Sequence, residues 1–184
     1  YTLIPKSGRT HHALNVSGSA NVTIEGGKFV GPKGTASESG SAVNVQSGAT
    51  VAISGGEFSG GKLNTLASSG TLSLTGGRYD QDVQKYCAEG YMTVKGTDGW
   101  YTVVEAVAKI VETGKIYATL SEAFAAATEG QTVVMLSNAE EVVNINKEAA
   151  VTLNMAGFTL TGSIMAPSAN LTVANGTIIN NDKN

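Results

Sequence analysis

The sequence lacks most features of disulfide-bonded or strongly charged proteins. It has 184 residues and one cysteine, Cys87, so it predicts neither an internal disulfide nor a metal site with several cysteine ligands. Charged residues make up 15% of the chain, below the roughly 25% of ordinary globular domains, and the formal net charge is −3. Because nucleic-acid-binding domains normally carry a basic patch, this balance argues against nucleic acid as a partner.

Long apolar stretches and a leader sequence are also missing. No run approaches about eighteen apolar residues, so the sequence predicts no membrane-spanning helix. The chain begins at Tyr1 with no basic-then-apolar leader, and we expect a processed product or a fragment. The scarcity of cysteine in a chain rich in Gly, Ser, Thr and Asn is compatible with secretion.

An internal repeat carries most of the structural signal. Residues 13–29 (ALNVSGSANVTIEGGKF) align without a gap to residues 42–58 (AVNVQSGATVAISGGEF), and nine of the seventeen positions are identical. A weaker third copy, TLASSGTLSLTGGRY, ends at Tyr79. Repetition of this kind predicts structural units that bury their apolar faces by stacking on one another.

Each copy has the pattern of a strand followed by a corner. Val22 and Ile24 alternate with Thr23 and Glu25, which indicates one buried and one solvated face. The glycine pair that follows permits a sharp turn, and Phe29 then fills the interior. The hairpin signals of an antiparallel sandwich are mostly absent. The pattern therefore predicts a mainly β chain folded as a parallel β-solenoid, in which each copy forms one rung.

Asn15 and Asn44 occupy equivalent positions in the first two copies. They could form an asparagine ladder, with one amide bonded to the next along the stack. They could equally be simple turn residues. The sequence leaves both interpretations open.

Residues 80–130 interrupt the repeat and predict a small α/β plug module. The segment from Asp80 to Gly90 indicates a short helix, and residues 91–107 indicate a hairpin with its turn near Asp98. Thr119-Leu-Ser-Glu122 is a capping box that opens a second helix, closed by Gly130. We therefore expect solenoid rungs at 1–79, the plug module at 80–130, and further rungs at 131–184.

The last rung resembles the first. Residues 168–178 (SANLTVANGTI) match residues 19–29 (SANVTIEGGKF), so the natural solenoid order is 131–184 followed by 1–79 of the next unit. Because an uncovered solenoid end leaves strand N–H and C=O groups unpaired, we expect the two ends to stack head to tail into a filament. The units could be separate subunits or repeats of one tandem protein, and a solenoid closed within one chain is the third possibility.

The expected assembly interface consists of apolar and amide side chains from the two end rungs. On the amino side these are Leu3, Ile4, Leu14, Val16, Val22 and Ile24, and on the carboxyl side Leu171, Val173, Asn175, Ile178 and Ile179.

Several strings resemble a known family. VTIEGGKF, VAISGGEF and VTLNMAGFTLTG are similar to rungs of pectin-lyase-like right-handed β-helices. The run from GGRYDQDVQKYCAEGYMTVKGTDGWYTVV to ATLSEAFAAATEGQTVVML resembles repeat units of large bacterial cell-surface proteins. The resemblance covers nearly the whole chain and implies a right-handed solenoid of structural or adhesive type, located outside the cell or on its surface. It implies no enzyme, because these repeats share the scaffold of polysaccharide lyases without a catalytic constellation.

The chemistry-bearing side chains predict no catalytic residue, metal site or cofactor. None of the four aspartates lies in a repeated strand, and Glu25 and Glu57 occupy different positions around the corner. Paired carboxylates for a polysaccharide lyase or hydrolase are therefore missing, which makes this the weakest alternative. His11 and His12 are neighbours, so in extended chain they point to opposite faces and do not chelate one metal ion. Cys87 is expected to be a buried thiol.

A carbohydrate-binding adhesin module is the main alternative function. Such a module would bind glycans or a host surface through exposed aromatic rings. The candidates all lie in the plug module: Tyr91, Trp100, Tyr101 and Tyr117.

Overall fold

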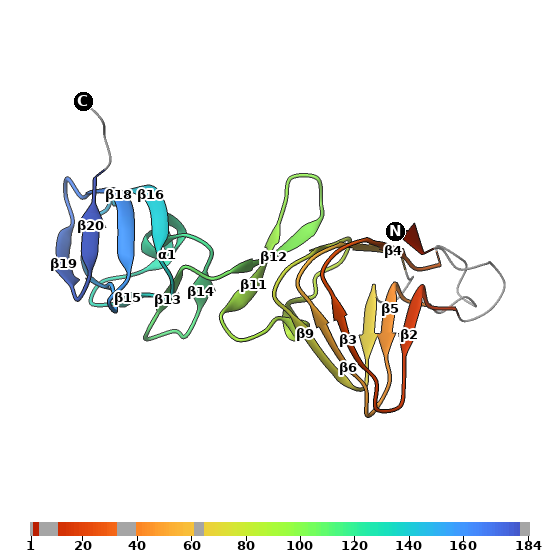
Figure 1. Cartoon of the computed structure of the whole chain (residues 1–184). Coiled ribbons are helices and arrows are strands. Elements are labelled where there is room, and N and C mark those ends of the chain that lie inside the picture. Colours follow the sequence, from red (N-terminus) through yellow and green to blue (C-terminus); the bar gives the residue numbers. More distant parts are fainter. Residues whose placement is uncertain (1, 4–10, 33–39, 61–64, 181–184) are drawn as a thin grey trace. The chain divides into compact units, whose positions relative to one another are not determined.

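The computed structural model describes residues 2–3, 11–32, 40–60 and 65–180, and every structural statement below concerns these residues. The chain divides into two compact units, Tyr1–Val104 and Glu105–Asn184 (Figure 1). Each unit contains parallel strands stacked rung on rung.

The first unit is a solenoid with three faces. Each rung gives one short strand to each face, and like strands pair in parallel with their neighbours (Figure 1, red to yellow). In stacking order the faces are β2 (Leu14–Val16), β5 (Val43–Val45) and β8 (Leu66–Ser68); β3 (Asn21–Ile24), β6 (Thr50–Ile53) and β9 (Thr71–Leu74); and β1 (Thr2–Leu3), β4 (Lys28–Val30), β7 (Glu57–Ser59) and β10 (Arg78–Tyr79).

The pairing register confirms the sequence repeat. Ile24 lies opposite Ile53, which lies opposite Leu74, so residues aligned by the repeat are neighbours in the stack. Ile53 and Leu74 are fully buried. The two offsets of 29 and 21 residues therefore differ only in the loops between strands.

An aromatic ladder runs through the core of this unit. The rings of Phe29, Phe58 and Tyr79 stack on successive rungs with centroids 5.0 Å apart at both steps. Phe58 and Tyr79 have no exposed surface, and the Tyr79 hydroxyl donates to the Gly76 carbonyl oxygen at 2.9 Å. The aromatic residue after each glycine pair thus fills the interior one rung at a time, as the repeat predicts.

The glycine corners are required by the approach of neighbouring rungs. A Cβ on Gly55 would lie 2.4 Å from the carbonyl oxygen of Glu25, and a Cβ on Gly76 would lie 2.1 Å from that of Ser54. Real Cβ atoms do not come so close to backbone, so only glycine allows the main chains to stack here.

Residues 80–104 close the far end of the first unit. Strand β12 (Tyr101–Glu105) pairs antiparallel with β10, and β11 (Tyr91–Lys95) completes the predicted hairpin. An isolated parallel bridge pairs Cys87 with Leu74, the last residue of β9. Together these segments end the parallel stack.

The helix predicted from Asp80 to Gly90 is reduced to one 3₁₀ turn, Gln84–Tyr86. Asp80 does not cap it, because its carboxylate accepts hydrogen bonds from the Gly60 N–H at 2.7 Å and from the Thr65 hydroxyl. The side chain that looked like an N-cap instead ties the third rung to the second.

The second unit repeats this arrangement in the opposite order, with its closed end first. Strand β13 pairs antiparallel with both β14 and β15, and the later strands stack in parallel. The elements are β13 (Ala108–Ile110), β14 (Ile116–Tyr117), α1 (Leu120–Ala126), β15 (Thr132–Met135), β16 (Ala139–Asn144), β17 (Ala150–Asn154), β18 (Thr159–Met165), β19 (Asn170–Ala174) and β20 (Thr177–Ile179).

Helix α1 begins at the predicted capping box. The Thr119 hydroxyl oxygen accepts a hydrogen bond from the Glu122 N–H at 3.0 Å. Leu120, Ala123 and Phe124 are buried in the core of the second unit. The predicted fold class is confirmed: the chain is mainly β, built of about six parallel stacked rungs, and has one short α-helix in its described part.

Gly55→Ala should destabilise the first unit, because the new methyl group collides with the Glu25 carbonyl oxygen. We expect a loss of about 1–3 kcal/mol, the usual effect of overpacking, measured by thermal or urea unfolding. Gly26→Ala is the matched control, since a Cβ there meets nothing within 4 Å among the described residues. Equal stability of the two variants would contradict the stacking described here.

Candidate functional site: the open edges of the two units

The amino-side edge of the first unit has two open strands and one covered strand. Among the described residues, β2 and β3 are outermost in their sheets and pair on one side only, with β5 and β6. β4 differs, because β1 pairs with it in parallel, Thr2 opposite Lys28 and Leu3 opposite Phe29. Leu3 therefore lies in the strand that continues the aromatic face, whereas Ile4 falls outside the described residues.

The other predicted amino-side residues lie in or against the core of their own unit. Val16 and Ile24 are 4% and 5% exposed, and Leu14 and Val22 are half-buried against the same core. What this edge offers to a neighbour is consequently the main chain of β2 and β3, rather than a set of exposed apolar side chains.

The carboxyl-side edge of the second unit is different in character. In the part of the chain that the structure describes, β19 and β20 are outermost and pair only with β17 and β18 (Figure 1, blue). Val173, Ile178 and Ile179 are 44%, 42% and 45% exposed, whereas Leu171 is half-buried against the core. The last rung thus presents both unpaired main chain and apolar side chains.

Asparagine side chains form ladders at both edges. Asn44 Nδ2 donates to Asn15 Oδ1 at 2.7 Å, which decides for the ladder at this position. Asn175 Nδ2 donates to Asn154 Oδ1 at 3.2 Å, and Asn175 itself has a left-handed φ of 60°. The end member of each ladder, Asn15 or Asn175, belongs to an outermost rung.

Gly26 stands apart from the other glycines of its column. Gly55 and Gly76 must be glycine because the backbone of the preceding rung lies against them. At Gly26 a Cβ would meet nothing within 4 Å, and its φ is outside the left-handed region that favours glycine. Within the described residues, neither space nor backbone conformation requires glycine at this position.

The end of the second unit that comes first in the chain order is closed by side-chain bonds as well as by strands. Glu141 of β16 accepts hydrogen bonds from the Leu120 N–H at 2.7 Å and from the Ser121 N–H and hydroxyl at 3.1 and 2.6 Å. This carboxylate holds the start of α1 against the stack. Within the described residues, each unit is thus closed at one end and has unpaired strand edges at the other.

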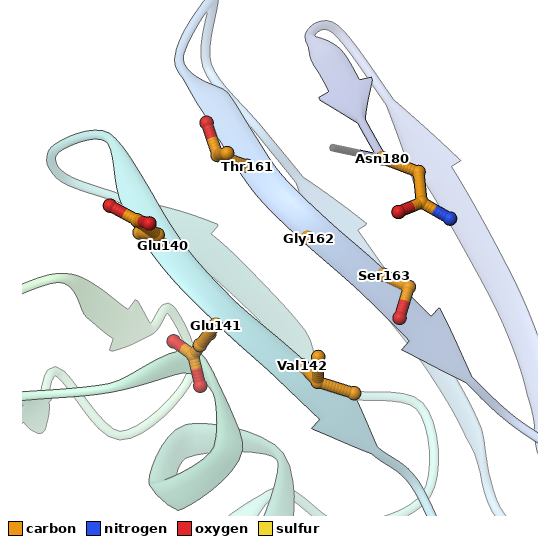
Figure 2. Close-up of a pocket in the computed structure, with 7 residues that line it drawn as sticks. All are labelled: Glu140, Glu141, Val142, Thr161, Gly162, Ser163 and Asn180. Carbon is orange, nitrogen blue, oxygen red and sulfur yellow. The ribbon is translucent and has the colours of Figure 1, made fainter. Parts of the chain in front are cut away.

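A shallow hollow lies on the outer face of β16 and β18 (Figure 2). Glu141 is engaged by α1, which leaves Glu140 as the remaining acidic side chain of the hollow. No group of three or more His, Cys, Asp or Glu side chains in the described part could hold a metal ion. The residues that line the hollow are Glu140, Glu141, Val142, Thr161, Gly162, Ser163 and Asn180.

The four aromatic residues considered for glycan binding do not form one exposed strip. The Trp100 ring has the Arg78 guanidinium 4.6 Å from its centroid, and Tyr101 has a lysine ammonium in a similar position. Tyr91 packs against the core of the first unit, whereas Tyr117 belongs to the second unit and is 8% exposed. The hairpin rings are therefore partly covered, and Tyr117 is buried.

No protein-family model, curated protein or solved structure matches this chain. The parallel solenoid therefore rests on the strand pairing described above, and the likeness to pectin-lyase-like repeats rests on sequence motifs. Among the described residues, none of the helices has the length and apolar character needed to cross a membrane.

The stability of the first unit should fall at acidic pH. His12 Nδ1 accepts a hydrogen bond from the Ser41 N–H at 3.0 Å, which requires an unprotonated Nδ1. Burial, and then the charge of His11, lower the pKa of His12 from its ordinary value of 6.5. Because the unfolded chain binds this proton more readily, the stabilisation is present above about pH 6.5 and is lost as the pH falls towards the lowered pKa.

We expect the melting temperature of the first unit to decrease between about pH 7 and 5, and His12→Asn to flatten that profile. His11→Asn is the control, because it keeps the His12–Ser41 bond. A wild-type profile retained in His12→Asn would contradict this assignment.

Proposed function

We propose that this chain is a structural repeat of an extracellular filament or surface stalk, assembled head to tail by solenoid stacking. The second unit of one copy, residues 105–184, would continue onto the first unit, residues 1–104, of the next. Both a separate subunit and the next repeat of a longer chain satisfy this arrangement. In either case one continuous solenoid would run from the second unit of one copy to the first unit of the next. The closed end of each of these two units would form one end of that solenoid.

Gly26 is the observation that carries the proposal. In the inner rungs, glycine is required in this column because a carbonyl oxygen of the preceding rung lies against it. The match of residues 168–178 to residues 19–29 aligns Ala174 with Glu25, whose carbonyl oxygen lies against Gly55. A neighbouring copy stacked in that register would place the Ala174 carbonyl oxygen against Gly26. Glycine would then be required at position 26 for the same steric reason as at position 55.

The same register matches side chains across the junction. Val173 would lie over Ile24, just as Ile24 lies over Ile53 inside the first unit. Val173 is 44% exposed, so covering it contributes about 1 kcal/mol, in addition to the main-chain hydrogen bonds of an added parallel strand. The proposed contacts between copies thus have the same residue register as the contacts between rungs inside the first unit.

The proposed location and handedness rest on the sequence. Low cysteine, abundant Ser, Thr and Asn, and the resemblance to repeats of bacterial cell-surface proteins support a right-handed solenoid outside the cell or on its surface. No specific contact favours the carbohydrate-binding adhesin module or the polysaccharide lyase or hydrolase over this function. The candidate aromatic rings are partly covered or buried, and the hollow of Figure 2 has one carboxylate that the helix does not engage.

Gly26→Ala should abolish association while leaving the fold intact. A methyl group there meets nothing within 4 Å among the described residues, but in the stack it would collide with the Ala174 carbonyl oxygen of the neighbour. We expect the native 18.8 kDa chain to associate as its concentration rises, and the variant to remain monomeric with an unchanged melting temperature. Sedimentation velocity and negative-stain electron microscopy measure both.

Ser54→Ala is the matched control, because it changes an exposed corner residue of an inner rung and should associate like wild type. Wild-type protein that stays monomeric at all concentrations, or Gly26→Ala protein that associates normally, would contradict the proposed function.

A further inference from the structure

Strand β1 occupies the place on the first unit that an incoming β20 would need. β1 pairs with β4, with Leu3 directly opposite Phe29. The alignment that places β19 on β3 aligns Ile178 with Phe29, and so places β20 on β4. In the proposed register, two strands would therefore compete for a single edge.

The two competing strands have similar sequences. β1 lies in the segment Thr2-Leu3-Ile4, and β20 is Thr177-Ile178-Ile179. Each is a threonine followed by two branched aliphatic residues, and in the alignment the two threonines occupy the same position opposite Lys28. By sequence, β1 is a close substitute for β20.

Adding β20 outside β1 would leave both copies poorly paired. β19 would then lie two strand spacings from β3, about 9.6 Å instead of about 4.8 Å. The edges of β2 and β3 would stay unpaired across a vacant rung. If β20 replaces β1, one parallel pairing substitutes for another, and the pairing of β19 with β3 is gained.

We infer that β1 is a placeholder strand, which covers β4 in the free chain and is displaced by β20 of the next copy. This inference rests on the proposed function, because the displacing strand comes from a second copy of the chain. β1 is two residues long and β20 is three. Residues 4–13 connect β1 to β2, and such a connection can extend to about 33 Å, which is long enough for β1 to leave.

Displacement of β1 would regulate the association of chains. A free chain keeps the edge of β4 paired until a partner that carries β20 arrives. Association should therefore be limited by strand displacement as well as by encounter between chains.

A reversible cross-link between β1 and β4 tests the displacement. Thr2→Cys and Lys28→Cys, in a Cys87→Ser background, place two thiols on directly opposed residues. Neighbouring strands lie about 4.8 Å apart, within the range of Cα separations that a disulfide spans. Ala52→Cys with Ser73→Cys is the matched control, because these residues oppose one another on inner strands β6 and β9.

We expect the oxidised β1–β4 pair to remain monomeric and the reduced form to associate, while the control pair associates in both states. Removal of residues 1–3 should lower the concentration for half-association by roughly tenfold, because no strand pairing has to be broken first. Sedimentation velocity measures association, and thermal unfolding verifies that each variant is folded.

The outcomes separate the inference from the function on which it rests. If the oxidised β1–β4 pair associates like wild type, or if removal of residues 1–3 weakens association, displacement is wrong and the end-to-end function stands. If wild-type protein and the reduced variants all remain monomeric, the proposed function fails, and the displacement inference fails with it.

Discussion

Parallel main-chain pairing between successive rungs is the constraint on which the rest of the structure depends. Successive rungs are about 4.8 Å apart, so each residue lies directly on its counterpart in the next rung. Side chains at equivalent positions must therefore be able to pack against a side chain of the same or a similar type. Phe29, Phe58 and Tyr79 do so by ring stacking, and Asn15 and Asn44 by amide hydrogen bonding. The glycine corners do so by having no side chain, and Gly55 is the clearest case.

Such a stack has no intrinsic end, because every rung leaves an edge for another. The chain closes two of its edges with different devices, the β11–β12 hairpin in the first unit and β13, β14 and α1 in the second. The outer edges of β2, β3, β19 and β20 carry no such cover in the described part of the chain. Closure at one end of each unit and exposure at the other give the arrangement its polarity, which the proposed head-to-tail function uses.

The sequence predicts the fold well in the repeated segments, where equivalent residues of successive copies stack on one another. The offsets of 29 and 21 residues fix the register because alternate apolar positions such as Val22 and Ile24 must all face the same interior. Prediction was poorer where the partner of a side chain is distant in sequence. Asp80 has the sequence pattern of a helix cap, yet it accepts hydrogen bonds from Gly60 and Thr65, which lie 20 and 15 residues earlier in the chain. The pairing of β1 with β4 could not be predicted from local sequence patterns, and neither could the lack of contacts at Gly26 among the described residues. Both depend on which segments lie beside the first rung.

Amide hydrogen exchange at low and high protein concentration tests end-to-end stacking most directly, because it reports on the edge strands themselves. If copies stack end to end, peptides covering β3 and β19 gain protection as concentration rises, while those covering β6 and β17, already paired on both sides, do not change. Exchange in β3 and β19 that is independent of concentration, in protein that is otherwise folded, would contradict the account.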